Sequence, residues 1–416
     1  MKSRTLFHLI LITFLASLIP AMHAQTFSVI YSFTGGTDGA FPSAGVTIRG
    51  NALYGTTGGE FNCGTVYQLT HSGSNWLLST LAGLSDPQGC GPRARVVFGP
   101  DGHLYGTTYT EGKYNYLYGG TVFKLTPQSG PCKDAACYWT VNDLHDFGPR
   151  PDGQQPGFGD LIWDQQGNIY GTTVYGGAPD CGFSGCGIVY ELTLSGNGYT
   201  ENVIYNFSLP DGVSPYGGLV FDNQGNLFGT TYGGSDAGTV FELTYVPGVG
   251  WTEHVLYNFQ GPDDGAFPVS GLIIDSSGNL YGTTPTGGSG SGGTVFELSP
   301  SGDTWTFKVL YSFSAPPGQF YGPQATLSMD EAGNLYGTTF YEGIYNLGSV
   351  FKLSNTQNGW VYTSLHDFTG LGTDGAFLRS NVAIDTDGTL YGTTLQGGDR
   401  NCNGGAGCGI VWMIKP

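Results

Sequence analysis

One short string, Leu-Tyr-Gly-Thr-Thr or a close variant of it, recurs seven times along this chain of 416 residues. A second string, Gly-Thr-Val-Phe or a variant, also occurs seven times and always follows the first. A repeat of this length is a supersecondary unit that cannot bury its apolar face alone, so neighbouring units must pack together. The first string begins, at steps of 51 to 65 residues, at Leu53, Leu104, Ile169, Leu227, Leu280, Leu335 and Leu390.

The fourth unit illustrates the four strand-like pieces that each unit contains. Residues 218–222 and 226–231 flank a tight turn that ends in Gly225. Residues 238–244 and 251–259 follow, and apolar side chains alternate along the last piece, as expected for a strand with one buried face. The composition agrees, because 72 glycines, 14% aromatic and only 11% charged residues favour short strands and turns over long helices.

The two ends of the chain favour a closed ring. Residues 27–33 are a piece of the fourth type and precede every piece of the other types, whereas the last unit has the first three types and lacks the fourth. We therefore predict an all-β fold, a seven-bladed β-propeller of four-stranded antiparallel blades. In this fold the N-terminal strand, within residues 25–33, completes the last blade, residues 379–416, and removes its open edge. A linear β-solenoid is the alternative, although its repeats are usually much shorter.

The first 24 residues have the features of a secretory signal peptide. Lys2 and Arg4 precede an apolar run over residues 6–19, and Ala24 is the expected last residue of the leader. An uncleaved anchor helix is the alternative, but the run is short for a bilayer. We predict a signal peptide over residues 1–24 and a single propeller domain over residues 25–416. The product would be secreted to the periplasm or the extracellular space, with no membrane insertion after the signal is removed.

The charge balance argues against nucleic acid as a partner. The chain has 14 Lys and Arg against 32 Asp and Glu, a formal net charge of −18. Contact with phosphates requires clustered basic side chains, and so does attraction to anionic lipid. A closed ring also leaves no edge strand that must pair, so we expect a monomer.

Eight cysteines agree with an oxidising compartment. Six of them form close pairs in the sequence, which leaves Cys63 to pair with Cys90. A zinc site is the alternative, but the spacings are unsuitable and no histidine is near. We predict no metal site and four disulfides: Cys63–Cys90, Cys132–Cys137, Cys181–Cys186 and Cys402–Cys408.

The connections between the second and third strands vary from 6 to 14 residues, whereas the turns between the first and second strands are short and uniform. Variable loops on a rigid scaffold are a usual location of function. Two of these loops resemble each other, and both offer aromatic rings, a carboxylate and an amide, a mixture that suits sugar recognition. The alternative is that their rings only pack the loop. The predicted ligand-binding residues are Tyr109, Glu111, Tyr114, Asn115, Tyr341, Glu342, Tyr345 and Asn346.

A second set of polar residues lies where the fourth strand of one unit leads to the first strand of the next. Five of these connections carry an Asp-Gly pair. Because they lead into the innermost strands, their carboxylates would rim the central channel. We predict no cofactor, although carboxylates placed in this way could bind calcium or a cationic ligand. The alternative is a turn that its own backbone stabilises. The predicted rim residues are Asp38, Asp152, Asp211, Asp264 and Asp374.

The repeated order NLYGTT, GTVFELT, LYSF and DGAFP covers essentially the whole chain after the leader. This pattern resembles the GloVer-type tandem-repeat proteins of exported bacterial origin. The resemblance implies an exported bacterial repeat protein, and it carries over no activity and no catalytic residue. Some members have a C-terminal anchoring segment, which we do not expect here because residues 409–416 have the pattern of a strand.

Motifs that would indicate an enzyme are absent from the sequence. It contains no HExxH, no Gly-x-Ser-x-Gly and no phosphate loop. His145 and His366 replace the tyrosine of the fourth strand, so they are expected to be packing residues. We therefore predict a non-catalytic scaffold that binds a glycan or a protein through variable loops on one rim. A polysaccharide lyase or hydrolase built on the propeller is the alternative.

Overall fold

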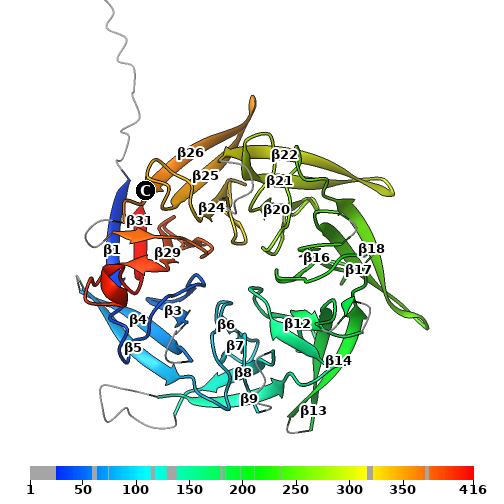
Figure 1. Cartoon of the computed structure of the whole chain (residues 1–416), viewed down its shortest axis with the longest axis horizontal. Coiled ribbons are helices and arrows are strands. Elements are labelled where there is room, and N and C mark those ends of the chain that lie inside the picture. The colour runs from blue at the N-terminus through cyan, green and yellow to red at the C-terminus, as the bar shows by residue number, and fades with distance from the viewer. Residues whose placement is uncertain are drawn as a thin grey trace, which may run out of the picture.

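The computed structural model describes residues 25–58, 63–73, 75–113, 118–128, 138–178, 181–182, 184–196, 198–209, 211–234, 236–315, 322–370 and 374–416. The predicted fold is confirmed: seven antiparallel blades surround a central channel, and the chain visits them in order (Figure 1). The predicted signal peptide, residues 1–24, lies outside the described residues. Among the residues described there is no helix long and apolar enough to span a membrane.

Each blade contains four main strands, named a to d from the channel outward (Figure 1). The a strands are β2 (Thr47–Arg49), β6 (Val97–Phe98), β11 (Ile162–Trp163), β15 (Val220–Phe221), β19 (Ile273–Ile274), β23 (Ser328–Met329) and β28 (Ala383–Ile384). The b strands are β3 (Ala52–Thr57), β7 (Leu104–Thr108), β12 (Ile169–Gly176), β16 (Leu227–Thr231), β20 (Leu280–Thr284), β24 (Leu335–Thr339) and β29 (Leu390–Thr394).

The outer half of each blade contains the longer strands. The c strands are β4 (Thr65–Ser72), β8 (Thr121–Thr126), β13 (Ile188–Ser195), β17 (Thr239–Val246), β21 (Ser291–Ser301), β25 (Ser349–Thr356) and β31 (Ile410–Lys415). The d strands are β5 (Asn75–Gly83), β9 (Thr140–Asp146), β14 (Gly198–Asn206), β18 (Gly250–Asn258), β22 (Thr304–Ser314), β26 (Gly359–Asp367) and β1 (Thr26–Ser32). Short additional elements lie in the loops: β10 (Gly153–Pro156), β27 (Gly375–Ala376), β30 (Gln396–Gly397) and the 3₁₀ turn η2 (Asn403–Gly405).

The N-terminal strand closes the ring as predicted. β1 pairs antiparallel with β31, and Phe27 lies opposite Ile414 in the register. The backbone N–H of Phe33 continues this pairing by donating to the carbonyl oxygen of Gly409 at 3.0 Å. The last blade is therefore built from both ends of the chain, and β1 covers the outer edge of β31.

The two threonines of the repeated string have separate tasks. The hydroxyl of the first donates to a carbonyl oxygen in the next blade, as from Thr230 to Ser270 at 2.7 Å. In five blades the hydroxyl of the second pairs with a hydroxyl of the neighbouring c strand, as between Thr231 and Thr239 at 2.7 Å. In the other two blades an isoleucine, Ile188 or Ile410, takes the c-strand position. Both kinds of contact are buried, so each hydroxyl needs such a partner. The repeated string thus carries the bonds that hold a blade together and the bonds that join it to its neighbour.

The a strands are shorter than predicted. The fourth unit was expected to begin a strand at residue 218, whereas β15 covers only Val220–Phe221. The preceding segments bond around the channel instead of along the blade: the N–H of Phe158 donates to the carbonyl oxygen of Tyr216 at 2.8 Å. A Cβ on Gly217 would lie 2.4 Å from the carbonyl oxygen of Ser270, so only glycine permits this approach.

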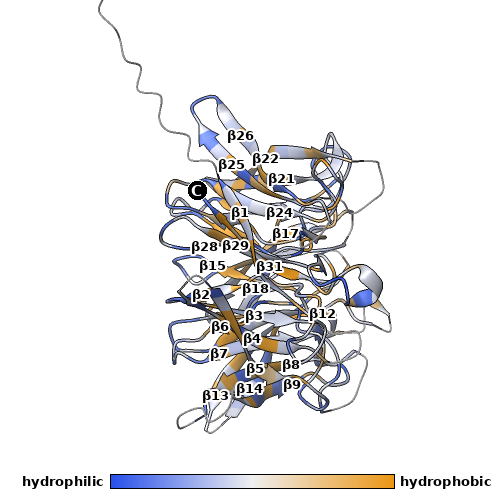
Figure 2. Cartoon of the chain, turned by 90° about the vertical axis from the view of Figure 1, so that its left-hand side faces the viewer, coloured by the Kyte–Doolittle hydropathy of each residue, from blue (hydrophilic) through white to orange (hydrophobic). Residues whose placement is uncertain are grey.

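The apolar core lies between the blades. Seven clusters of buried residues each join two neighbouring blades, and one of them contains Phe228 and Val240 of one blade with Leu280 and Phe296 of the next. In the side view the apolar colouring follows the strands (Figure 2). Because no blade buries both faces alone, the stability of each depends on its neighbours.

Candidate functional site at the channel mouth

One pocket of about 300 Å³ opens in the central channel, and segments from all seven blades line it. The residues come mainly from the connections that lead into the a strands. A volume of this size lies at the lower end of the range for small-molecule sites. The charged, aromatic and amide residues of the lining include Arg93, Arg95, Phe158, Asp160, Tyr216, Tyr232, Arg379 and Asn381.

These residues occupy a position that the repeat itself marks. Six of the connections contain a proline, and the seventh has Leu378 in its place. In five blades the residue just after this position lines the pocket, and its type varies: Arg93, Tyr216, Val269, Gln324 and Arg379. These five residues are not among those predicted from the sequence. The sequence does carry a signal for them: in each unit a variable residue follows the nearly constant proline.

Arg95 has a carboxylate partner within the pocket. Its Nε donates to Oδ2 of Asp160 at 2.8 Å, and Nη2 donates to the same oxygen. With its amide oriented so that the oxygen faces Arg95, Asn381 accepts from Nη1 at 2.9 Å. The charge of Arg95 is therefore compensated, and its guanidinium is held in place.

Arg93 and Arg379 have no such partner. In the part of the chain that the structure describes, no carboxylate forms a salt bridge with either residue. The Arg93 guanidinium lies 3.5 Å from the ring centroid of Tyr109, and that of Arg379 lies 4.8 Å from the ring centroid of Phe340. The channel walls desolvate Arg379 although it remains exposed, and this desolvation, together with the charge of Arg93, lowers its pKa.

Aromatic rings form a band along one side of the channel mouth. Successive ring centroids are separated by 6.5 Å from Tyr109 to Phe158, 5.8 Å to Tyr216, 5.5 Å to Tyr232 and 5.1 Å to Phe267. All five rings are partly exposed. We call these five residues the aromatic belt.

A second group of rings comes from the last two blades. Phe340 lies 4.5 Å from Tyr341 and 5.5 Å from Phe377, measured between ring centroids. Phe377 and Phe267 both have left-handed backbones, with φ of 63° and 58°. Such a backbone is strained for a phenylalanine. It is held by the N–H of each residue, which donates to a carbonyl oxygen of the preceding blade's loop, that of Ala237 for Phe267 and that of Leu347 for Phe377.

The predicted ligand-binding residues separate into different surroundings. Tyr109 belongs to the aromatic belt and Tyr341 to the second group of rings. Tyr345 is 54% exposed, and Asn346 has a left-handed backbone with φ of 55°. Tyr114 and Asn115 lie outside the described residues. The two aromatic loops therefore supply rings to the channel mouth, but neither carboxylate is among the residues that line the pocket.

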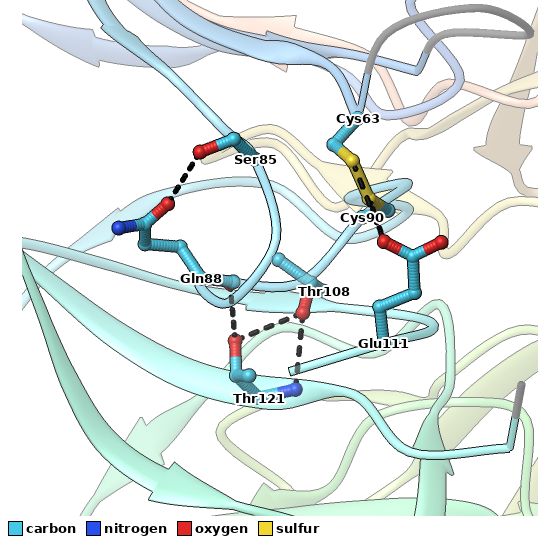
Figure 3. Close-up of a disulfide and its surroundings, with 7 residues drawn as sticks. All are labelled: Cys63, Ser85, Gln88, Cys90, Thr108, Glu111 and Thr121. Atoms are coloured by element: carbon cyan, nitrogen blue, oxygen red, sulfur yellow. Dashed lines mark hydrogen bonds between the residues drawn. A yellow bond between two sulfur atoms is a disulfide. The ribbon is translucent and has the colours of Figure 1, made fainter. Parts of the chain in front are cut away.

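The carboxylates of Glu111 and Glu342, predicted to bind the ligand, are not among the groups that line the pocket. An oxygen of Glu111 lies 2.7 Å from Sγ of Cys90 (Figure 3). That sulfur belongs to the Cys63–Cys90 disulfide and carries no hydrogen, so the contact is not a hydrogen bond. Glu342 has one buried carboxylate oxygen without a partner, and burial raises its pKa to about 7.

Three predicted disulfides are present: Cys63–Cys90, Cys181–Cys186 and Cys402–Cys408. Cys132 and Cys137 lie outside the described residues. The Cys63–Cys90 bond joins the b-to-c loop of the first blade to the connection that leads into the second (Figure 3). It therefore links two blades on the rim where the aromatic loops lie.

The five aspartates of the Asp-Gly pairs point toward the outer strands. Their carboxylates contact the tyrosine or histidine of the preceding d strand, at distances from 2.7 Å for Asp211 and Asp264 to 3.4 Å for Asp152. Most also accept backbone N–H groups of their own loop, as Asp38 does from Thr34 at 2.8 Å. The channel pocket is lined by other residues. The full set of contacts is Asp38 with Tyr31, Asp152 with His145, Asp211 with Tyr205, Asp264 with Tyr257 and Asp374 with His366.

Two of these contacts lie beside a glutamate of the next blade. Ligand atoms of His145, Asp152 and Glu201 lie within 4.8 Å of one another, a grouping that would fit a divalent cation. Burial alone would lower the pKa of His145, but the hydrogen bond and charge of Asp152 raise it. A protonated imidazole can therefore balance the charge of the neighbouring carboxylates.

A similar pair lies at the next seam between blades. Glu253 faces Asp211, and burial, reinforced by the charge of that carboxylate, raises the pKa of Glu253 to about 7.

The family model for the Gloeobacter/Verrucomicrobia repeat matches residues 18–183 and 174–406. The chain belongs to this family. The match confirms the resemblance inferred from the repeated strings, and the Gloeobacter/Verrucomicrobia repeat corresponds here to a propeller built from its consecutive units. No curated protein matches the chain.

Solved structures share the fold of this Gloeobacter/Verrucomicrobia repeat protein at low identity. A Bacteroides uniformis protein assigned as a 6-phosphogluconolactonase is 15% identical, with a TM-score of 0.51, over 82% of this chain and 88% of that one. An ulvan lyase bound to a glucuronate–sulfated rhamnose saccharide is 12% identical, with a TM-score of 0.50, over 89% and 94%. At such identities the likeness establishes the fold and nothing about activity.

Proposed function

We propose that this protein is an exported, non-catalytic binding protein that holds a glycan at the mouth of its central channel. The observation that carries the proposal is the aromatic belt, five partly exposed rings in succession beside a pocket of about 300 Å³. Aromatic side chains offer a large apolar surface at low entropic cost, which suits the apolar faces of sugar rings. A row of rings also suits an extended ligand better than a compact one.

The chemistry of the pocket favours binding over catalysis. Among the described residues that line it, the one carboxylate is Asp160, and it is already engaged in a salt bridge with Arg95. Burial raises the pKa of the Tyr109, Tyr216 and Tyr232 hydroxyls, so these groups remain protonated at neutral pH. A general base needs a pKa near the working pH.

A polysaccharide lyase or hydrolase remains the second candidate function. The observation that favours it is the pair of guanidinium groups of Arg93 and Arg379, which could neutralise a charge on a substrate. The three disulfides are compatible with export to an oxidising compartment, where polysaccharides are found.

Both functions can be tested on one sample of residues 25–416. A glycan array measures binding, and chromatography of the same polysaccharides measures depolymerisation. We expect binding without cleavage. Replacing one belt ring, in Tyr216→Ala or Tyr232→Ala, should weaken binding about two- to tenfold, the range expected for one aromatic contact.

Tyr245→Ala is the matched control, because Tyr245 is 57% exposed on β17 and packs on Trp251 away from the pocket. Tyr345→Ala tests the loop tip predicted from the sequence. Shortened polysaccharide products would favour the enzyme. Binding that is unchanged in both belt variants would place the ligand elsewhere.

A further inference from the structure

We infer that the glycan bound at the channel mouth is acidic, and that Arg93 and Arg379 together form its anion-binding subsite. This inference rests on the proposed function and names the chemical class of its ligand: a saccharide that carries carboxylate or sulfate groups. The pocket is positively charged, two of its arginines have no carboxylate partner among the described residues, and an aromatic ring stacks on each of the two guanidinium groups.

The charge of the pocket is opposite to that of the chain. The chain carries a net −18, with only 14 Lys and Arg in 416 residues. Three arginines and one aspartate nevertheless line this single pocket, which gives it a formal charge of +2. A concave site with low-dielectric walls concentrates its field, so the channel mouth would attract an anion that the rest of the surface repels.

Arg95 provides a comparison within the same pocket. Its charge is balanced by Asp160, as expected for an arginine with a structural role. Outside the pocket, Arg49 is also stacked on a ring, 4.2 Å from the centroid of Phe98, and its Nη1 donates to the carbonyl oxygen of Gly102 at 2.8 Å. Arg93 and Arg379 have neither kind of acceptor in the described part of the chain.

Arg93 and Arg379 each stack on an aromatic ring in a way that leaves them able to bind an anion. Tyr109 covers one face of the Arg93 guanidinium, and Phe340 lies against that of Arg379. Stacking occupies the flat face and leaves the N–H edges, which bind carboxylate or sulfate oxygens in pairs. The two charges also repel each other, as the effect of Arg93 on the pKa of Arg379 indicates. An anion between them would relieve this repulsion.

The test compares ligands that differ only in charge. Polygalacturonate and its fully methyl-esterified form share one backbone, and dextran sulfate and dextran form a second such pair. We expect the folded chain to bind at least one acidic polymer at least tenfold more tightly than its neutral counterpart at low salt. The difference should shrink as salt is raised, because screening weakens the charge term. Preference for one of the two acidic polymers would assign the anion as carboxylate or sulfate.

Variants locate the subsite. Arg93→Gln and Arg379→Gln should each weaken binding of the acidic polymer about tenfold or more, the effect of losing a charged hydrogen bond, and leave binding of the neutral polymer unchanged. Arg49→Gln is the matched control and should change neither. Circular dichroism of each variant confirms that the propeller is intact.

The two proposals fail in different ways. If neutral and acidic polymers bind equally and Tyr216→Ala weakens both, the glycan site stands and the anion subsite is wrong. If the acidic preference survives both arginine variants, the subsite is also wrong. If the folded chain binds no polysaccharide of either pair, both proposals are overturned.

Discussion

The hydroxyl of Thr393 donates a hydrogen bond to the carbonyl oxygen of Ala44 at 2.8 Å, across 349 residues of sequence. It joins the last blade to the first, and Pro42 provides a second acceptor at 3.0 Å. The corresponding threonine makes the same kind of bond at other seams, as Thr230 does with Ser270. The closing seam of the ring is therefore held by the same interaction as most internal seams.

Removing the seam hydroxyl should destabilise the ring. We expect Thr393→Val and Thr230→Val each to lower the free energy of unfolding by about 1–3 kcal/mol, because each leaves a buried carbonyl oxygen without its partner. Urea denaturation measures the change. Thr363→Val, at an exposed position of β26, should have little effect. Losses no larger than that of this control would show that the seams do not depend on these bonds.

The turn between the a and b strands depends on one aspartate in most blades. The carboxylate of Asp275 accepts from the N–H of Ser277 at 2.8 Å, from both nitrogens of Asn279 and from the hydroxyl of Tyr281. Burial would raise the pKa of Asp275, but these hydrogen bonds outweigh it and lower the pKa. The stability that depends on this ionised carboxylate is therefore present above about pH 4 and lost as the pH falls further.

We expect Asp275→Ala to lower the free energy of unfolding by about 1–3 kcal/mol at pH 7, and by less at pH 3. Asp303→Ala, in the exposed turn between β21 and β22, is the control. Denaturation curves at the two pH values measure the effect. An equal loss at both would contradict the role of the ionised carboxylate.

A half-buried glutamate, Glu253, should make stability decrease toward neutral pH. The pKa of Glu253 is raised from 4.5 to about 7, first by burial and then by the charge of Asp211, and one carboxylate oxygen is buried without a partner. The folded state therefore holds a proton that the unfolded state has already released between about pH 4.5 and 7. Its contribution to stability is complete below pH 4.5 and is lost as the pH rises through 7.

Glu253→Gln removes this titration. We expect the variant to gain stability relative to the parent as the pH rises from 5 to 8, in unfolding curves measured across that range. Glu331→Gln, at an exposed turn, should follow the parent at every pH. The prediction is wrong if the Glu253 variant also follows the parent.

The disulfide between blades should contribute more stability than a short local one. Cys63–Cys90 closes 27 residues of chain and Cys181–Cys186 closes 5. On the chain-entropy view, the paired Cys→Ser variants should lose about 3.5 and about 2 kcal/mol respectively. Equilibrium unfolding of both variants measures the difference. The reverse order would mean that effects in the folded state outweigh the loop entropy.

The sequence by itself determined the architecture. The strings around Leu227 and Gly238 repeat at every blade, since each blade must make similar turns and pack against its neighbours in a similar way. The N-terminal strand at residues 27–33 predicted the closure with β31, because the last unit has no fourth strand of its own. These features depend on contacts between residues at regular spacing, so the repeat can be recognised in the sequence alone.

The tertiary structure alone decided the site. Arg93 and Arg379 are 286 residues apart in the sequence and meet only because the ring closes. The sequence also did not show which way the side chain of Asp264 points. Its carboxylate turns outward and accepts a hydrogen bond from the hydroxyl of Tyr257. A repeat makes constant positions conspicuous, whereas a binding site uses the positions that vary. Which of these face one another is a property of the closed ring, because the channel exists only when all seven blades surround it.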